Sequence, residues 1–336
     1  MLRPRVVLVG VGAFGKNHLR VLRELEQSGL CELYAVVDKS KKALEVARSL
    51  IGSSGVKFTP DLEPLLRNAD AVDIVTPAST HYELCKACLE EGCHVFVEKP
   101  MATSYRQALD LVRTATKQSL VLAVGHIFRY NMAVRFVKDY VGRGQLGDVY
   151  YLTGKFINLK APRNDVGAIL NYAVHHVDIF SFVLGALPTH VFCYKGHYLN
   201  RSMLEDAGFI MLKYPKGIIA TLEVSWVHPI KRRTLTVVGG RQSLFVDLLE
   251  QKVRIFDARL ELEGEGFKPR IYGERVLNIK HEEPLKLELT DFLESIVYGR
   301  EPLASGRQVL FVIRVLELAI KSAREGREVR IHYDRF

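Results

Sequence analysis

The sequence has no apolar run that approaches the roughly 20 residues needed to span a bilayer. It also has no internal repeat and no low-complexity tract. Its first residues lead straight into a predicted strand, which leaves no room for a secretory signal. These absences exclude a membrane-spanning protein, and we expect a soluble, cytoplasmic protein with no membrane partner.

Cysteine is scarce, because five cysteines in 336 residues are too few to suggest a disulfide framework. His81, Cys85 and Cys88 fall at helical spacing, with Cys93 and His94 just beyond them. A structural zinc site needs four converging ligands, and this segment instead predicts a helix followed directly by a strand. We therefore expect buried, reduced thiols and no metal.

Negative charge is in deficit, and the formal net charge is +9. Lysine and arginine are nevertheless spread along the chain, and the clusters at 39–42 and 231–233 are short. Most such charges form a solvated face, and no nucleic-acid-binding motif is present. We expect no nucleic-acid partner. The excess charge favours an anionic substrate, such as a phosphorylated or nucleotide-linked sugar.

What the chain does contain is enough residues for two domains, in proportions ordinary for a globular protein. Strands alternate with helices up to residue 125, which predicts an α/β domain with a doubly wound parallel sheet. Beyond residue 148 strands follow one another, which predicts an α+β domain with an open-faced, mainly antiparallel sheet. We place the domains at 1–125 and 126–336, with the alternative that the C-terminal helix packs back on the first.

The hydrophobic pattern predicts the elements as follows. Strands are expected at 6–9, 32–37, 56–58, 71–75, 94–97, 120–124, 149–159, 191–195, 209–214, 217–226, 234–238, 243–247, 253–256 and 329–331. Helices are expected after Gly15 and at 41–50, 61–66, 81–90, 104–117, 132–141, 168–184, 285–298 and 308–325.

Three glycines, Gly10, Gly12 and Gly15, follow the first strand. In a strand–turn–helix unit the first glycine makes the tight turn and the second lets the backbone approach a pyrophosphate. The third lets the helix pack closely on the strand. The helix N-terminus then offers N–H groups and partial positive charge to the phosphates. An ordinary turn is the alternative, but the second strand ends at Asp38, where a carboxylate should meet the adenosine ribose.

This context predicts dinucleotide binding. Asp38 favours NAD, because it would accept hydrogen bonds from the ribose hydroxyls and repel a 2′-phosphate. NADP stays an alternative, since Lys39 and Lys41 lie close by in the sequence and a cation could soften that repulsion.

Ligands of a doubly wound sheet lie beyond the carboxyl ends of its strands. The predicted ends carry the glycine loop, Asp38, Thr76-Pro77 and Glu98-Lys99-Pro100. Lys99 therefore differs from a solvated surface lysine, and Pro100 restricts it to extended geometry. We expect Lys99 to face the cofactor.

A second group of polar residues lies on the helix predicted at 168–184. Asn171, His175 and Asp178 are spaced i, i+4, i+7 and so share one helix face. A helical histidine is more often structural, but beside a dinucleotide site His175 becomes a candidate acid/base. His176 lies about 100° round the helix and is expected to pack in the core.

The motifs, in order, resemble those of the Gfo/Idh/MocA family (glucose–fructose oxidoreductase and inositol dehydrogenase) over essentially the whole chain. They are Gly10-x-Gly12-x-x-Gly15, Asp38, Thr76-Pro77-x-x-x-His81, Glu98-Lys99-Pro100, Asp165-x-Gly167-x-x-x-Asn171-x-x-x-His175-x-x-Asp178, Glu301–Gly306 and Ser322–Arg327. Many folds share the glycine motif, whereas Glu-Lys-Pro together with Gly…His-x-x-Asp is fairly specific.

The resemblance implies a Rossmann domain followed by a domain for substrate binding and oligomerisation. It implies an NAD(P)-dependent oxidoreductase that transfers a hydride between nicotinamide and a carbinol carbon of a sugar, inositol or nucleotide sugar. It also implies subunits that pair through their sheets. The strictly alternating strand Thr221–Trp226 agrees, because its uncovered face needs a partner, and we expect a homodimer or homotetramer.

Carried over residue by residue, the resemblance implies that Lys99, His175 and Asn171 are catalytic. Asn171 stands where many members carry aspartate, and an amide orients a hydroxyl but cannot take its proton, so His175 is the better acid/base candidate. The implied cofactor-binding residues are Gly10, Gly12, Ala13, Phe14, Gly15, Asp38, Thr76, Pro77, His81, Glu98 and Lys99. The implied substrate-binding residues are Lys99, Arg129, Asn171 and His175.

The substrate is less closely defined. Arg129-Tyr130-Asn131 resembles the branch that acts on nucleotide-linked amino sugars, so the interpretation leans to a UDP-linked amino sugar 3-dehydrogenase. Two alternatives are a non-catalytic NAD(P)-binding sensor or regulator and a basic nucleic-acid-binding protein.

Overall fold

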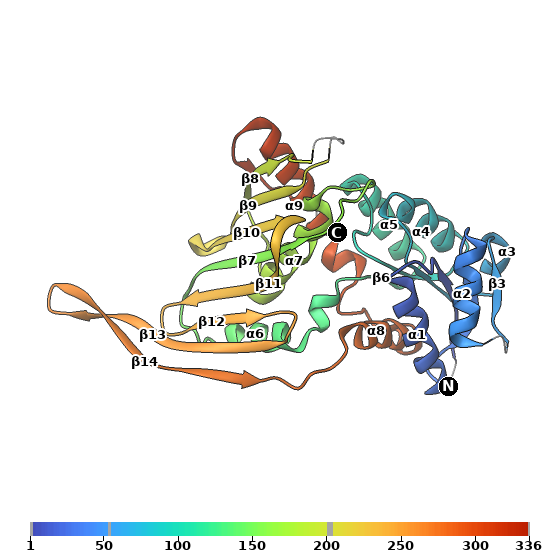
Figure 1. Ribbon diagram of the computed structural model, residues 1–336, viewed down its shortest axis with the longest axis horizontal. Coiled ribbons are helices and arrows are strands. Elements are labelled where there is room, and N and C mark those ends of the chain that lie inside the picture. Colours follow the sequence, from blue (N-terminus) through green and yellow to red (C-terminus); the bar gives the residue numbers. More distant parts are fainter. Residues whose placement is uncertain (1–2, 53–54, 200–203, 335–336) are drawn as a thin grey trace. The chain divides into compact units, whose positions relative to one another are not determined.

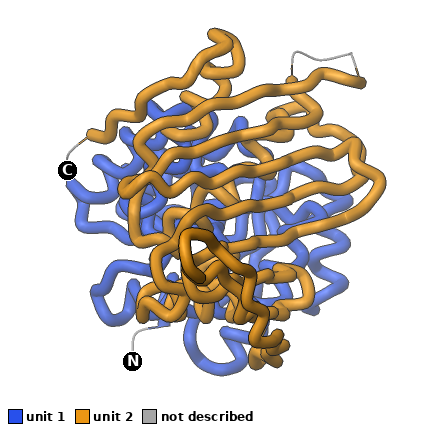
Figure 2. The backbone as a smooth tube through the Cα atoms, turned by 90° about the vertical axis from the view of Figure 1, so that its left-hand side faces the viewer, with its two compact units in different colours: residues 1–127, 283–313 blue, residues 128–282, 314–336 orange. Residues whose placement is uncertain are grey.

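The computed structural model describes residues 3–52, 55–199 and 204–334, in two compact units. The first unit comprises residues 1–127 and 283–313, and the second comprises residues 128–282 and 314–336 (Figure 2). The predicted division at residue 125 is close to this boundary. The structure differs from the predicted division in one respect, because residues 283–313 belong to the first unit.

Six parallel strands form the sheet of the first unit, in the order β3-β2-β1-β4-β5-β6. The strands are β1 Arg5–Val9, β2 Glu32–Val37, β3 Lys57–Thr59, β4 Ala71–Ile74, β5 His94–Val97 and β6 Leu122–Val124. The helices that alternate with them are α1 Gly15–Gln27, α2 Lys41–Ile51, α3 Glu63–Leu66, α4 His81–Glu90 and α5 Tyr105–Lys117. The strand order reverses between β1 and β4, which is where doubly wound sheets bind ligands.

Two later helices complete the first unit: α8 (Pro284–Tyr298) and the start of α9 (Gly306–Glu325). Leu285, Leu289 and Phe292 of α8 are buried in the same core as β1 and α1. The ring of Phe292 lies 5.7 Å from that of Phe96 in β5. An amphipathic pattern marks α8 as a helix but does not say which core covers its apolar face. The sequence therefore could not assign α8 to the first unit.

A mainly antiparallel sheet of nine strands forms the second unit, in the order β14-β13-β12-β11-β7-β10-β9-β8-β15 (Figure 1). The strands are β7 Val149–Leu159, β8 His190–Gly196, β9 Ala207–Lys213, β10 Ile219–Ser225, β11 Val227–Gly239, β12 Ser243–Asp247, β13 Lys252–Glu263, β14 Gly266–Asn278 and β15 Val329–Arg330. Among these pairs, β7–β10 is parallel. Helix α6 (Met132–Gly142) contacts β12, and α7 (Val174–Leu184) contacts β7.

The opposite face of this sheet is open. Tyr151, Tyr194, Phe209 and Met211 point away from the core and are 45 to 63% exposed. In β9 the residues between Phe209, Met211 and Lys213 are buried, and β10 alternates over residues 221–224 as the sequence predicts.

The structure adds a long hairpin that the sequence analysis missed. Only residues 253–256 were expected as a strand, whereas β13 and β14 together extend from 252 to 278. Ion pairs, such as Arg254 Nε to Glu274 Oε1 at 2.6 Å, join the two strands, and nearly every side chain of β14 is exposed. Without burial there is no clear apolar alternation, and the pattern therefore carried no strand signal.

Candidate functional site

The glycine loop after β1 has the geometry that a pyrophosphate needs. Gly10 has φ +93°, and a Cβ there would lie 2.6 Å from the carbonyl oxygen of Val75. A Cβ on Gly15 would lie 2.0 Å from the carbonyl oxygen of Gly10, so the helix can approach the loop only at glycine. A Cβ on Gly12 would meet nothing within 4 Å. A side chain at Gly10 or Gly15 would therefore collide with the protein backbone, whereas the loop has free space beside Gly12.

Helix α1 begins at this loop and has no side-chain cap. Phe14 occupies the N-cap position without a side-chain hydrogen bond to the helix, and its own side chain is 41% exposed. In the first turn, the N–H groups of Lys16 and Asn17 donate to the carbonyl oxygens of Gly12 and Phe14. No side-chain oxygen covers the positive end of the helix dipole, which therefore suits a phosphate.

Asp38 is held directly beside the loop. Its Oδ2 accepts a hydrogen bond from the backbone N–H of Val11 at 2.9 Å, and its Oδ1 accepts one from Ser40 at 2.8 Å. Each carboxylate oxygen keeps a lone pair for a further donor. The glycine loop, the uncapped helix and Asp38 together fit the pyrophosphate and ribose of NAD.

His81 braces the next two strand ends. It is buried, and its ring nitrogens lie 2.7 Å from the carbonyl oxygen of Pro100 and 2.9 Å from that of Thr76. Carbonyl oxygens only accept, so both contacts are satisfied when both ring nitrogens donate, as in imidazolium. His81 thereby ties the segment after β4 to the segment after β5. Its direct contact with cofactor, like that of Thr76 and Pro77, stays a prediction.

A buried polar cluster lies behind the Glu98-Lys99-Pro100 segment. His18 Nδ1 lies 2.9 Å from Asp73 Oδ2, and His18 Nε2 lies 3.4 Å from Glu98 Oε1. Burial by itself lowers the pKa of His18, but the carboxylates of Asp73 and Glu98 outweigh it and raise that pKa to about 10. His18 is therefore an imidazolium inside the core of the first unit.

Glu288 of α8 is the fourth member of this cluster. Its carboxyl is buried, and neither oxygen has a hydrogen-bond partner among the described residues. Burial, together with the negative charge of Glu98, raises the pKa of Glu288 well above its usual value. These surroundings thus favour the protonated form of Glu288.

The cluster ends at the backbone of Lys99. Glu98 Oε2 accepts a hydrogen bond from the Lys99 backbone N–H at 3.2 Å. A Cβ on Gly125 would lie 2.6 Å from Glu98 Oε1, so glycine leaves the room that this carboxylate occupies. The Lys99–Pro100 peptide bond is cis, whereas the sequence predicted only extended geometry for Lys99. Lys99 itself is partly exposed at the carboxyl end of β5.

In the second unit, the predicted helix at 168–184 is divided. Residues Ile169–Ala173 form a π-helical turn, and α7 begins at Val174. A π turn closes on the fifth residue, so the local period at Asn171 differs from the 3.6 residues that the sequence analysis assumed, and the shared face of Asn171 and His175 stays a prediction. His175 and Asp178 both lie within α7 and still share a face. Single π turns occur frequently at functional sites.

His175 lies among aromatic rings and is 7% exposed. Its ring stacks on Phe156 at 4.9 Å and 17°, and it meets the edge of Phe128 at 5.1 Å. His176 differs from it. It is fully buried, its Nε2 lies 2.9 Å from the carbonyl oxygen of Thr234, and burial lowers its pKa to about 4. His176 is thus a neutral packing residue.

Arg129 and Asp178 form a buried, bidentate ion pair. Arg129 Nη2 lies 2.6 Å from Asp178 Oδ1, and its Nε lies 2.9 Å from Oδ2. Arg129 is 4% exposed and Asp178 is 1% exposed. This pair ties the segment before α6 to α7, one turn beyond His175. Contact of Arg129 with substrate stays a prediction.

Models of one protein family match both units of the chain. The model of an oxidoreductase family with an NAD-binding Rossmann fold matches residues 4–126, and the C-terminal α/β domain model of the same family matches residues 138–331. The chain belongs to the Gfo/Idh/MocA oxidoreductase family.

Two curated members of the family are similar to the chain over nearly its whole length. UDP-N-acetylglucosamine 3-dehydrogenase of Acidithiobacillus ferrooxidans is 26% identical over 96% of this chain and 99% of the relative. The NAD⁺-dependent scyllo-inositol 2-dehydrogenase of Bacillus subtilis is 27% identical over 98% of this chain and 97% of the relative.

Among solved structures of family members, the WlbA dehydrogenase of Bordetella pertussis, in complex with NADH and UDP-GlcNAcA, has the same fold. Its TM-score is 0.81 at 23% identity, over 99% of this chain and 100% of that one. The chain is thus an NAD-dependent oxidoreductase with a Rossmann domain and an open-faced sheet domain, as the resemblance implied.

The sequence analysis missed His18, Asp73 and Glu288. One signal was present, because Asp73 interrupts the otherwise apolar strand Ala71–Ile74. A carboxylate in a strand buried on both faces requires a partner. The partners come from α1 and α8, and no local pattern in the sequence shows that these helices meet there.

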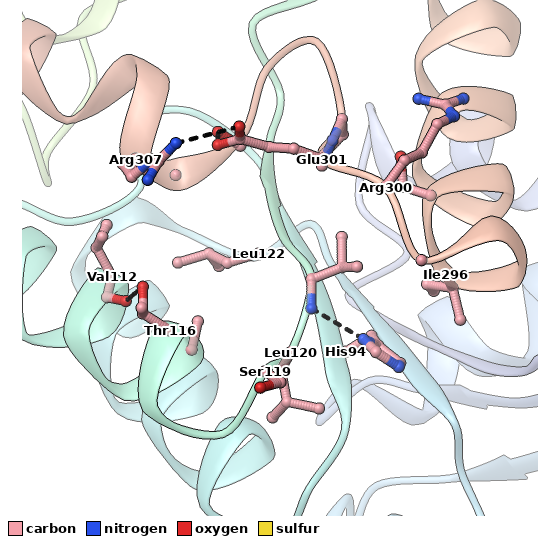
Figure 3. A pocket seen from close by; sticks show the side chains of 17 residues that line it. His94, Val112, Thr116, Ser119, Leu120, Leu122, Ile296, Arg300, Glu301 and Arg307 are labelled. Atoms are coloured by element: carbon pink, nitrogen blue, oxygen red, sulfur yellow. Dashed lines mark hydrogen bonds and ion pairs between the residues drawn. The ribbon is translucent and has the colours of Figure 1, made fainter.

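A pocket of about 470 Å³ in the first unit lies beside the segment 301–306, away from the glycine loop and Asp38 (Figure 3). It is lined by the amino ends of β5 and β6, among them His94 and Leu122, and ligands of this fold bind at the carboxyl ends. Its arginines already have partners: Arg300 pairs with Asp291 and Glu294, and Arg307 pairs with Glu301. We assign it no function.

Within residues 3–52, 55–199 and 204–334, no group of three or more histidine, cysteine or acidic side chains is placed to hold a metal ion. In the same ranges, no helix is both long and apolar enough to cross a membrane. The five cysteines are free and buried.

Proposed function

We propose that this protein is a dehydrogenase for the secondary hydroxyl of a sugar-type substrate, with NAD as hydride acceptor. The observation that carries the proposal is the placement of Lys99. It follows β5 at the same sheet edge as the glycine loop and Asp38, and its backbone is anchored by the buried carboxylate of Glu98.

When bound, nicotinamide supplies the hydride acceptor for this reaction. The protein must remove the hydroxyl proton and stabilise negative charge on the oxygen as the carbonyl forms. Lys99 supplies the positive charge, and His175 accepts the proton, because imidazole titrates near neutral pH. Asn171 orients the hydroxyl, since an amide cannot take a proton.

Asp38 sets the cofactor preference. Its oxygens, oriented by the N–H groups of Val11 and Ser40, would accept hydrogen bonds from the ribose 2′- and 3′-hydroxyls of bound NAD. A 2′-phosphate at that position would meet the carboxylate and be repelled. NAD is therefore favoured over NADP.

For the substrate, we favour a UDP-linked N-acetylamino sugar oxidised at its 3-hydroxyl. The name of the Acidithiobacillus relative and the ligand of the Bordetella structure support this choice. The net charge of +9 also suits a diphosphate. The scyllo-inositol relative supports a neutral cyclitol as the alternative.

The decisive experiment is a substrate screen. Purified enzyme and NAD⁺ are mixed with UDP-N-acetylglucosamine, its uronic acid, free sugars and inositols, and NADH is followed at 340 nm. We expect reduction with a UDP-linked sugar. Reduction only with inositols would contradict the substrate assignment, and no reduction with any carbinol would contradict the activity.

One observation favours a second candidate, a non-catalytic NAD(P)-binding sensor: Asn171 replaces the aspartate that many members carry. A sensor would bind NADH, and substitutions at Lys99 and His175 would leave its response unchanged.

We also propose that subunits pair through the open face of the second unit's sheet, as a homodimer or homotetramer in the cytoplasm. Tyr151, Phe209 and Met211 support this proposal, because side chains of this kind are rarely left together in water.

A further inference from the structure

Arg233 of β11 is a cation that has no carboxylate partner within residues 3–52, 55–199 and 204–334. Its guanidinium carbon lies 4.3 Å from the ring centroid of Phe156, the residue opposite it on β7. The side chain is partly buried and makes no salt bridge or side-chain hydrogen bond with any residue that the structure describes. Phe156 in turn stacks on His175, so one aromatic ring contacts both Arg233 and the candidate base.

Two other arginines of the second unit, by contrast, are neutralised by carboxylates. Arg129 is paired bidentately with Asp178, and Arg163 is paired bidentately with Asp165 through contacts of 2.7 and 2.6 Å. Burial lowers the pKa of Arg233, yet a guanidinium stays protonated in proteins. A partly desolvated charge of this kind is unfavourable unless an anion compensates it.

Unsatisfied polar atoms lie beside Arg233. Tyr172 packs on Phe156 at 4.7 Å and is 5% exposed. Its hydroxyl and the Oδ1 of Asn158 are buried, and neither has a hydrogen-bond partner at normal geometry among the described residues. Burial raises the pKa of Tyr172, against the smaller effects of a weak side-chain hydrogen bond from Asn158 to the phenol oxygen and of the positive charges of Arg233 and Arg163. The phenol therefore stays protonated and able to donate.

We propose that Arg233 binds an anionic group of the substrate, a phosphate or a carboxylate, with the Tyr172 hydroxyl as a second donor. The inference rests on the proposed function, because it takes the substrate to lie at His175. The planar guanidinium presents two parallel N–H donors, which match two oxygens of either anion. The spare Oδ1 of Asn158 is an acceptor and suits a sugar hydroxyl rather than the anion.

The test compares Arg233→Gln with Arg232→Gln, which removes the same charge from the exposed neighbouring residue. Binding is measured by calorimetry in the presence of NAD⁺ with three probes: UDP, glucuronate and the uncharged methyl glycoside of N-acetylglucosamine. We expect Arg233→Gln to weaken binding of one anion by about 10- to 100-fold, typical of a lost charge-assisted hydrogen-bond pair. Arg232→Gln should change it less than twofold.

The probe that responds identifies the source of the anion, since UDP reports a phosphate site and glucuronate a carboxylate site. Arg233→Lys keeps the charge without the fork and should recover part of the loss, which a misfolded variant would not do. Tyr172→Phe should weaken the same anion by a few fold. The inference is overturned if the wild type binds neither anion, if Arg233→Gln binds both normally, or if Arg232→Gln loses as much.

This result is separable from the proposed function, because binding is read without turnover. If the protein binds an anion through Arg233 but oxidises no carbinol, the proposed dehydrogenase activity is contradicted and the anion site stands. If Arg233→Gln oxidises anionic and neutral sugars with unchanged KM, the anion site is contradicted and the dehydrogenase activity stands.

Discussion

At the scale of single residues, the same residue type performs opposite tasks in different surroundings. Three histidines show this. His18 is held as a cation by two carboxylates, His176 is kept neutral by burial, and His175 stacks between aromatic rings next to a π turn. The sequence pattern distinguished His175 from His176 by helical spacing. It could not foresee the charge of His18, whose partners come from distant segments.

The catalytic assignment predicts a specific order of losses. Lys99→Ala should remove the charge that stabilises the developing oxyanion, and His175→Ala should remove the proton acceptor. Each should lower kcat by about 10²- to 10⁴-fold. Asn171→Ala should be milder, since the amide only orients the hydroxyl. Turnover and NADH affinity are measured for each variant on the substrate found by the screen.

His176→Ala is the matched comparison. His176 is the next residue of α7 after His175, but its ring nitrogen contacts the backbone carbonyl oxygen of Thr234. It should lower stability more than turnover of the folded enzyme. NADH binding should change little in the Lys99 and His175 variants. Near-normal turnover in His175→Ala with loss in His176→Ala would show that the wrong histidine had been chosen.

Asp38 makes the cofactor choice testable with one residue. NADH should bind at least about tenfold more tightly than NADPH, because a 2′-phosphate near a fixed carboxylate costs a kcal/mol or more. Asp38→Ser should reduce the ratio of the two dissociation constants, because it weakens NADH binding and removes the repulsion between the carboxylate and the 2′-phosphate of NADPH. Fluorescence titration with both cofactors gives the two dissociation constants. Equal or tighter NADPH binding in the wild type would contradict the assignment.

At the scale of elements, the first unit follows its sequence closely. β2, α4 and β5 have the predicted bounds, because their apolar runs and capping signals are local. Two features departed from the pattern. The π turn at Ile169–Ala173 leaves the apolar period almost unchanged, and the β13–β14 hairpin is held by ion pairs rather than burial. Periodicity detects neither kind of feature.

The packing of α8 on the first unit makes the stability of the folded protein depend on pH. Glu288 has a raised pKa in the folded protein, so folding takes up protons and stability falls as pH rises above about 4.5, the ordinary value of a glutamate. His18 acts in the same direction: its contribution is full below 6.5 and is lost as pH rises toward about 10.

Glu288→Gln should remove the first of these contributions, because a neutral amide has no proton to lose. The Tm of the variant relative to wild type should therefore be higher at pH 8 than at pH 5. Thermal melts across this range test the expectation, with Glu294→Gln, at a partly exposed position of the same helix, as control. Parallel pH profiles for wild type and Glu288→Gln would contradict it.

At the scale of the whole molecule, the open sheet face is the feature that a single chain leaves unexplained. From β8 to β12, one row of this face is formed by residues that stand opposite one another on neighbouring strands, and no member of this part of the row is charged. The row comprises Phe192, Met211, Thr221, Thr153, Thr236 and Phe245. A two-fold axis can bring such a row onto a copy of itself without opposing like charges.

This row predicts which substitution breaks the assembly. Wild type should have a mass in light scattering that is a multiple of 38.0 kDa. Met211→Glu should shift it toward the monomer, because two copies of the new charge would be buried near the two-fold axis without partners. Leu187→Glu alters a residue that is 40% exposed outside the sheet and should leave the mass unchanged. A wild type that stays at 38.0 kDa at micromolar concentration would show that this face meets no second copy. An oligomer that survives Met211→Glu would place the interface elsewhere.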